Sequence, residues 1–86
     1  MRPLPQSVVV YYPYMTSSEQ DKMRRELGKK LRDVRETAKL TQQEVADSSG
    51  MHVNYYARIE RGEENPSFEK LQSIMKVLHI KSLDLL

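Results

Sequence analysis

The sequence predicts one small all-α domain, for three reasons. Its 86 residues are enough for one domain but too few for two. From Ser17 onward, apolar residues recur at intervals of three and four, which is the period of a helix. Residues that start and stop helices stand at the ends of these periodic segments. The chain has no cysteine, so disulfides, thiolate metal sites and cysteine nucleophiles are excluded and packing alone must stabilise the fold.

Residues 1–16 are predicted to form a non-helical N-terminal arm. They contain three of the four prolines and a β-branched, tyrosine-rich patch, with no helical period. One interpretation is a flexible terminus, and the other is a short strand over residues 8–12 that pairs with another chain. No apolar run approaches the ~18 residues needed to cross a bilayer, and Pro13 ends the apolar patch before it reaches the length of a signal-peptide core. We therefore expect a soluble, cytoplasmic protein.

The first helix is expected to begin at Ser17. Ser17 and Gln20 have the spacing of a capping box, and Ser18 is an alternative cap. Gly28 marks a point where the helix can be interrupted. The apolar stripe of this helix consists of Met23, Leu27, Leu31, Val34 and Ala38.

Two short helices follow, and together they have the helix-turn-helix pattern at about residues 41–62. The first begins after Thr41, which caps it, and Glu44 closes the capping box. It ends before Gly50, which lies in the connecting turn. The second runs over about residues 53–61 and stops at Gly62.

The C-terminal part of the chain predicts two further helical segments. Ser67 caps a fourth helix, and Ser82 caps a short last turn over residues 83–86. The apolar face of the fourth helix consists of Phe68, Leu71, Ile74, Met75 and Leu78.

Charge is distributed unevenly, although the formal net charge is only +2. Over residues 22–39, eight basic residues stand against three acidic ones, which leaves +5. Over residues 40–65, two arginines stand against five acidic residues, which leaves −3. A basic stretch is often only a solvated helix face, so charge alone identifies no partner.

Three segments of the chain carry a resemblance to a known family. They are LTQQEVA at residues 40–46 with Gly50, YARIERG at residues 56–62 with NPS at residues 65–67, and VLHI at residues 77–80 with the leucines of residues 83–86. On these motifs, roughly residues 27–86 resemble the Cro/C1-type (Xre-like) transcriptional regulator family. The resemblance implies a five-helix, lambda-repressor-like domain over residues 17–86, which binds double-stranded DNA as a homodimer on an inverted-repeat operator.

The sequence departs from the family pattern at three places. Val53 and Asn54 stand where longer polar residues are common, and His52 replaces the usual Ser or Thr cap of the recognition helix. Glu63 and Glu64 lie in a loop that is often basic in relatives.

An ion pair between Arg35 and Glu60 is expected inside the domain. At ~100° per residue, Glu60 shares the inward side of its helix with Tyr56 and Ile59. A buried carboxylate needs a partner, and Arg35 lies on the apolar side of the first helix. The resemblance implies a structural ion pair at these positions, and the alternative is two solvated surface charges.

The outward side of the third helix is predicted to read DNA bases. Asn54 can bond adenine, Arg58 can reach O6 and N7 of guanine, and the methyls of Val53 can touch a thymine methyl. Each residue also has a simpler interpretation: Asn54 as a helix cap, Arg58 as a phosphate contact and Val53 as packing.

Phosphate contacts are predicted at three further positions. Gln42 lies in the first turn of its helix, where free N–H groups suit a phosphate, and the resemblance implies the same role. Tyr55 and Arg61 are the other phosphate candidates.

Other classes of function have less support in the sequence. An enzyme is not expected, because there is no glycine-rich phosphate loop and His52 and His79 are not spaced as a metal pair. We therefore expect no catalytic residue, cofactor or metal. The alternative function is an antitoxin-type or other protein-interaction module, which binds its own promoter and uses the N-terminal arm to bind a protein partner.

Overall fold

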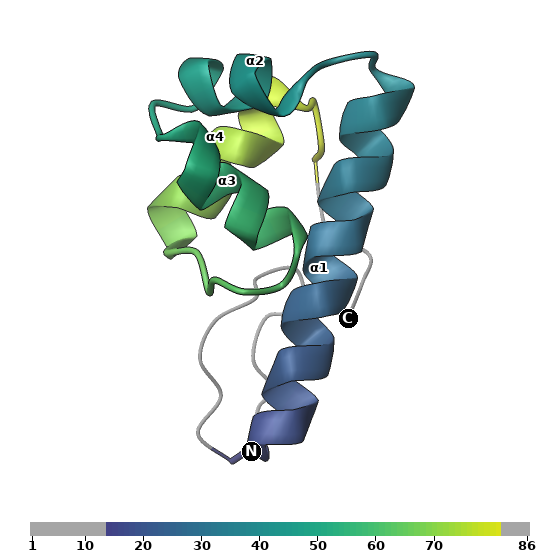
Figure 1. Cartoon of the computed structure of the whole chain (residues 1–86), viewed down its shortest axis with the longest axis vertical. Helices are drawn as coiled ribbons and strands as arrows, with labels where there is room; N and C mark the ends of the chain where they lie inside the picture. Colours follow the sequence, from purple (N-terminus) through teal and green to yellow (C-terminus); the bar gives the residue numbers. More distant parts are fainter. Residues whose placement is uncertain (1–13, 82–86) are drawn as a thin grey trace.

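The structure is a computed structural model that describes residues 14–81. In chain order its helices are α1 (Ser17–Thr37), α2 (Gln42–Ser48), α3 (Val53–Glu60) and α4 (Phe68–Val77). The three shorter helices gather against the C-terminal half of α1, whose N-terminal half extends beyond them (Figure 1). The all-α class is confirmed for the described residues, which contain four helices and no strand. The predicted last turn, its Ser82 cap and most of the N-terminal arm, with the alternative strand, lie outside the described residues.

Helix α1 begins at Ser17 as predicted, but its cap is one residue earlier than predicted. Thr16 is the cap: its hydroxyl accepts from the Glu19 N–H (3.1 Å), and Oε1 of Glu19 accepts from the Thr16 N–H (2.8 Å). The predicted box of Ser17 and Gln20, with Ser18 as alternative, is therefore wrong. Three hydroxyl residues in a row compete for this position, and only Thr16 has a glutamate carboxylate three residues later to complete the box.

Helix α1 runs without interruption through Gly28, a point at which the sequence allows a break. A Cβ atom at Gly28 would lie 2.3 Å from the Glu60 carbonyl oxygen and 2.5 Å from that of Ile59. The glycine therefore permits the backbones of α1 and α3 to approach closely. The predicted apolar stripe is one position too long, because Ala38 lies beyond the helix as its exposed C-cap.

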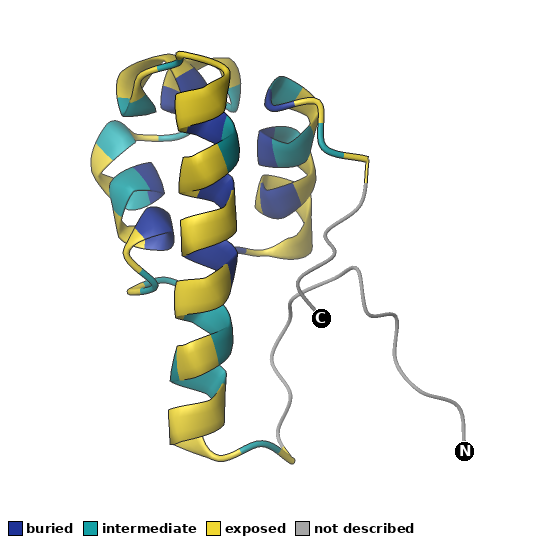
Figure 2. Cartoon of the chain, turned by 90° about the vertical axis from the view of Figure 1, so that its right-hand side faces the viewer, coloured by how far each residue is buried: buried dark blue, intermediate teal, exposed yellow. Residues whose placement is uncertain are grey.

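The core lies between the C-terminal half of α1 and the three shorter helices. Buried residues occur where these helices meet, whereas the N-terminal part of α1 is exposed or half-buried (Figure 2). Phe68, predicted to face inward, is 43% exposed because it lies one turn before the buried part of α4. The buried apolar residues are Leu27, Leu31, Val45, Ala46, Tyr56, Ile59, Leu71, Ile74 and Leu78.

Helices α2 and α3 end at the two glycines that the sequence indicates. Gly50 has φ +72° and Gly62 has φ +78°, the left-handed conformation that glycine adopts without strain. After α3, the Glu63 N–H donates to the Arg58 carbonyl (2.8 Å), which satisfies a carbonyl of the last turn. This turn fixes the course of the loop that follows α3.

Helices α1 and α4 end in the same way without glycine. Lys39 (φ +60°) and His79 (φ +58°) adopt the left-handed conformation at the corresponding positions. After α1, the Leu40 N–H donates to the Arg35 carbonyl (3.1 Å), as in the glycine-terminated helices. All four helices of the described region therefore stop by one backbone motif.

Candidate nucleic-acid interface

Helix α3 has a buried side and an exposed side. Tyr56, Ile59 and Glu60 are buried against the rest of the domain, because α3 packs on both α1 and α2. The exposed side carries Asn54 and Arg58, and Arg61 follows directly after the helix.

Val53 and Tyr55 lie between these two sides. Both are half-buried and pack against the core cluster, so each presents only part of its side chain to solvent. The ammonium group of Lys70 lies over the ring of Tyr55, 5.6 Å from its centroid. Tyr55 is therefore held by α4 as well as by its own helix.

Arg35 and Glu60 meet in a two-point ion pair inside the domain. Nε of Arg35 donates to Oε2 of Glu60 (2.7 Å), and Nη2 donates to Oε1 (3.0 Å). Nη1 of Arg35 donates to the Leu40 carbonyl (2.9 Å), in the connection between α1 and α2. The side chains of Arg35 and Glu60 are only 11% and 2% exposed, so this contact is not a solvated surface pair.

Each member of the pair stabilises the charged form of the other. Burial, the largest single influence, would raise the pKa of Glu60, but Arg35, Tyr56 and Gln42 together outweigh it, and the pKa is lowered. The hydrogen bond to Glu60 raises the pKa of Arg35. Burial raises the pKa of the neighbouring Tyr56 phenol, and Glu60 raises it further, so this hydroxyl stays protonated.

Gln42 contributes a third hydrogen bond to this carboxylate. Nε2 of Gln42 donates to Oε1 of Glu60 (2.9 Å), and the side chain is half-buried. One hydrogen of the Gln42 amide is thus committed within the domain, which its sequence position did not indicate. Glu60 consequently connects the start of α2, the last turn of α1 and the end of α3.

The starts of α2 and α3 are both capped by side chains. Thr41 and Glu44 form the predicted capping box of α2. Nδ1 of His52 accepts from the Asn54 N–H (3.0 Å) and caps α3. The interpretation of Asn54 as the cap is therefore wrong, and its exposed side chain makes no hydrogen bond within residues 14–81.

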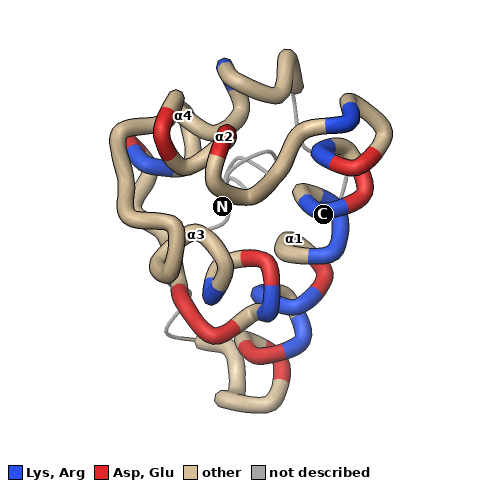
Figure 3. Tube along the Cα trace, turned by 45° about the horizontal axis from the view of Figure 1, so that its top comes forward, with Lys and Arg blue, Asp and Glu red and all other residues tan. Residues whose placement is uncertain are grey.

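Both arginines of the exposed side are paired with the loop that follows α3. Nη2 of Arg58 lies 3.2 Å from Oε2 of Glu64, and Nη2 of Arg61 lies 3.1 Å from Oε1 of Glu63. The bond from Arg61 lowers the pKa of Glu63. Figure 3 shows the charged positions along the Cα trace, with α1 carrying both signs over its length.

A comparison with family models identifies this architecture. A helix-turn-helix model matches residues 31–86, well over half of the chain. The chain belongs to the Cro/C1-type helix-turn-helix family. The family comprises DNA-binding regulatory domains and is not a known enzyme family. A comparison with curated proteins gives no match to this sequence.

Within the matched region, α2 and α3 follow one another along the chain, and residues 49–52 connect them. The matched region begins at Leu31, so the first two thirds of α1 precede the family segment.

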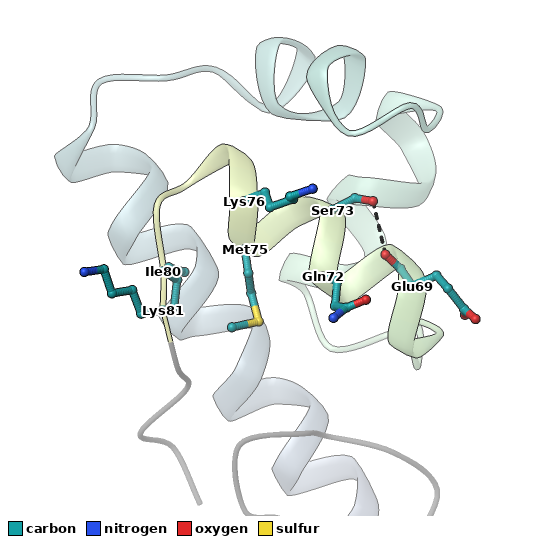
Figure 4. A pocket seen from close by; sticks show the side chains of 7 residues that line it. All are labelled: Glu69, Gln72, Ser73, Met75, Lys76, Ile80 and Lys81. Atoms are coloured by element: carbon teal, nitrogen blue, oxygen red, sulfur yellow. Dashed lines mark hydrogen bonds between the residues drawn. The ribbon is translucent and has the colours of Figure 1, made fainter.

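The helix-turn-helix domain also has a shallow hollow of about 430 Å³ beside α4 (Figure 4). The one hydrogen bond among its lining side chains joins the Ser73 hydroxyl to the Glu69 carbonyl within α4 (3.1 Å). Met75 and Ile80 line it alongside charged side chains such as Lys76. No helix among the described residues has the length and apolar character needed to cross a membrane.

Proposed function

We propose that this protein is a sequence-specific transcriptional regulator that binds double-stranded DNA as a homodimer on an inverted-repeat operator. The observation that carries the proposal is the two-sided structure of α3. Its buried side is held by the core and by the Arg35–Glu60 pair, whereas Asn54 and Arg58 are exposed on the other side. A helix supported in this way can enter a major groove without any change in the core.

Sequence reading is proposed for three residues of α3. Asn54, with no hydrogen bond to the described residues, can pair with the N6 and N7 edge of adenine. Arg58 can donate two hydrogen bonds to O6 and N7 of guanine. The exposed part of Val53 can contact a thymine methyl.

Phosphate binding is proposed for Gln42, Tyr55 and Arg61. Gln42 uses one amide hydrogen on Glu60, and its second amide hydrogen can donate to a phosphate oxygen. Arg61 is 56% exposed at the end of α3 and can reach the DNA backbone as a cation. Such contacts position the protein but carry no sequence information.

A homodimer is proposed because one recognition helix reads only a few base pairs. Two helices about one turn of DNA apart, or ~34 Å, double the length of the site and give it dyad symmetry. We propose the leucines of residues 83–86 as the dimer contact. Monomers on DNA in sedimentation, or a preferred site without a dyad, would refute this part of the proposal.

The test of DNA reading is selection of binding sites from random duplexes, followed by titration of variants on selected and scrambled duplexes. Arg58→Ala should weaken binding to the selected duplex by about 1 to 3 kcal/mol and flatten the preference at one position of each half-site. Failure of the wild-type protein to prefer any duplex would refute sequence-specific binding.

Two further variants distinguish phosphate contacts from base contacts. Gln42→Ala should weaken binding to all sequences alike with little change in salt dependence, because the amide is neutral. Arg61→Ala should reduce the salt slope by about one unit for each phosphate that the arginine no longer neutralises. If Arg58→Ala weakens both duplexes equally and reduces the slope, Arg58 binds phosphate, and reading belongs to Val53 and Asn54.

A further inference from the structure

The loop after α3 returns a carboxylate to the arginine that is proposed to read guanine. The left-handed Gly62 and the bond from the Glu63 N–H to the Arg58 carbonyl (2.8 Å) turn the chain back along α3. Glu64 then reaches Nη2 of Arg58 (3.2 Å). The backbone motif that ends α3 therefore also places Glu64 beside Arg58.

The contact between Arg58 and Glu64 lies in a segment that has few positive charges. Residues 40–65 carry a net charge of −3, and Arg58 and Arg61 are their only basic residues. Each of the two arginines has a loop carboxylate within 3.2 Å. The helix-turn-helix segment therefore offers little net positive charge to the phosphates that dominate non-specific DNA binding.

We propose that Glu64 is a specificity-determining residue, which disfavours phosphate at Arg58 while leaving Arg58 able to read guanine. The inference rests on the proposed function, in which Arg58 contacts a base. Glu64 lowers the affinity for random DNA and thereby increases the preference for the operator.

The hydrogen-bonding geometry of the guanidinium explains how Arg58 can keep both contacts. Its five N–H donors form two edges with two parallel donors each, Nε with Nη2 and Nη1 with Nη2. The ion-pair contact of Glu64 is at Nη2 (3.2 Å). A carboxylate held at Nη2 leaves one two-donor edge for O6 and N7 of guanine.

A phosphate at the same place meets a different environment. It would bring a second anion to a cation that already has Glu64, and the two anions repel each other. The guanine acceptors are uncharged, so they avoid most of this repulsion. Glu64, with a side chain 32% exposed, is partly shielded from solvent, which limits screening of the effect.

The test compares Glu64→Gln with Glu63→Gln in the full-length chain. Both variants remove one negative charge from adjacent residues of the same loop, which makes them a matched pair. Each is titrated on the selected duplex and on a random-sequence duplex at several salt concentrations. Circular dichroism and thermal unfolding establish that both variants remain folded.

Glu64→Gln should tighten binding to the random duplex about two- to five-fold, the range for release of an exposed ion pair, and leave the selected duplex within about two-fold. The ratio of the two affinities should therefore fall. Glu63→Gln should tighten both duplexes alike, because Arg61 binds phosphate in both complexes. Combined with Arg58→Ala, Glu64→Gln should no longer lower the affinity ratio.

Two outcomes would overturn the inference. If Glu64→Gln changes the affinity for both duplexes by the same factor as Glu63→Gln, the effect comes only from the change in net charge. If Glu64→Gln weakens binding to the selected duplex alone, Glu64 instead supports Arg58 in its reading position. Both outcomes leave sequence-specific binding by the wild-type chain intact, whereas a wild-type chain without any preferred duplex refutes the proposed function itself.

Discussion

The Arg35–Glu60 pair should be the most sensitive polar contact in the domain. Glu60→Ala removes both carboxylate oxygens from Arg35, whose side chain is only 11% exposed. The guanidinium retains a single hydrogen bond, to the Leu40 carbonyl. Removal of one partner from a buried pair costs about 3 to 5 kcal/mol, because the remaining charge stays desolvated.

A loss of this size is a large fraction of the stability of a small domain. It corresponds to a fall in Tm of more than ~10 °C for a domain of this length. Urea unfolding at low temperature is the appropriate assay, because it still measures a variant that is partly unfolded at 37 °C. Glu60→Gln retains the side-chain volume and isolates the loss of charge, so it should destabilise the domain less than Glu60→Ala.

The double variant Arg35→Met/Glu60→Met is the control for the mechanism. It leaves no unpaired charge, so it should recover much of the stability lost in Glu60→Ala. A loss below ~1 kcal/mol for Glu60→Ala, as for an exposed pair, would refute the reasoning. A double variant less stable than Glu60→Ala would show that packing, and not an unpaired charge, causes the loss.

Three more predictions follow from the same structure. Because the pKa of Glu60 is lowered, the ionised carboxylate should contribute its full stabilisation of the fold above the ordinary pKa of 4.5, and this contribution should be lost as the pH falls through the lowered pKa. In Glu60→Gln, the free energy of unfolding should therefore fall less steeply at acid pH. Gly28→Ala should lower the free energy of unfolding by at least ~1 kcal/mol despite the higher helix propensity of alanine, because the added Cβ meets backbone oxygens. A higher free energy of unfolding in urea would contradict the close approach of the two helices. Lys39→Gly should raise the free energy of unfolding by up to ~1 kcal/mol, because glycine adopts the left-handed conformation without strain. Ala38 is exposed and has a right-handed backbone conformation, so the control Ala38→Gly should not raise the free energy of unfolding.

The sequence predicts those parts of the fold that depend on local chemistry. The capping box of α2 and the glycine at the end of α3 are predictable because each uses residue types with few other roles. Lys39 and His79 end helices in the same conformation, but lysine has no preference for it and histidine only a weak one, so these two turns emerge from the backbone. The predicted cap of α1 is displaced by one residue because three hydroxyl side chains in succession offer nearly equal caps.

Pairwise contacts are harder to predict than helix faces. The inward direction of Glu60 follows from its helical phase, and Arg35 is the charged residue on the facing apolar stripe. The sequence does not reveal the bond from Gln42 to Glu60, because a surface-facing first turn gives no sign that its amide turns inward. The contact between Arg58 and Glu64 depends on the course of the loop after Gly62, which helical periodicity does not describe.

The close backbone approach at Gly28 bears on how this domain can acquire new binding preferences. Main-chain atoms of the last turn of α3 rest against α1, so this part of the α3 position does not depend on outward side chains. Under the proposed function, substitutions at positions 54 and 58 can therefore alter the recognised sequence while the helix keeps its place in the domain. Because of Gly28, DNA specificity can change during evolution without loss of the fold. The exposed side of α3 is therefore a suitable site for grafting the recognition residues of other regulators.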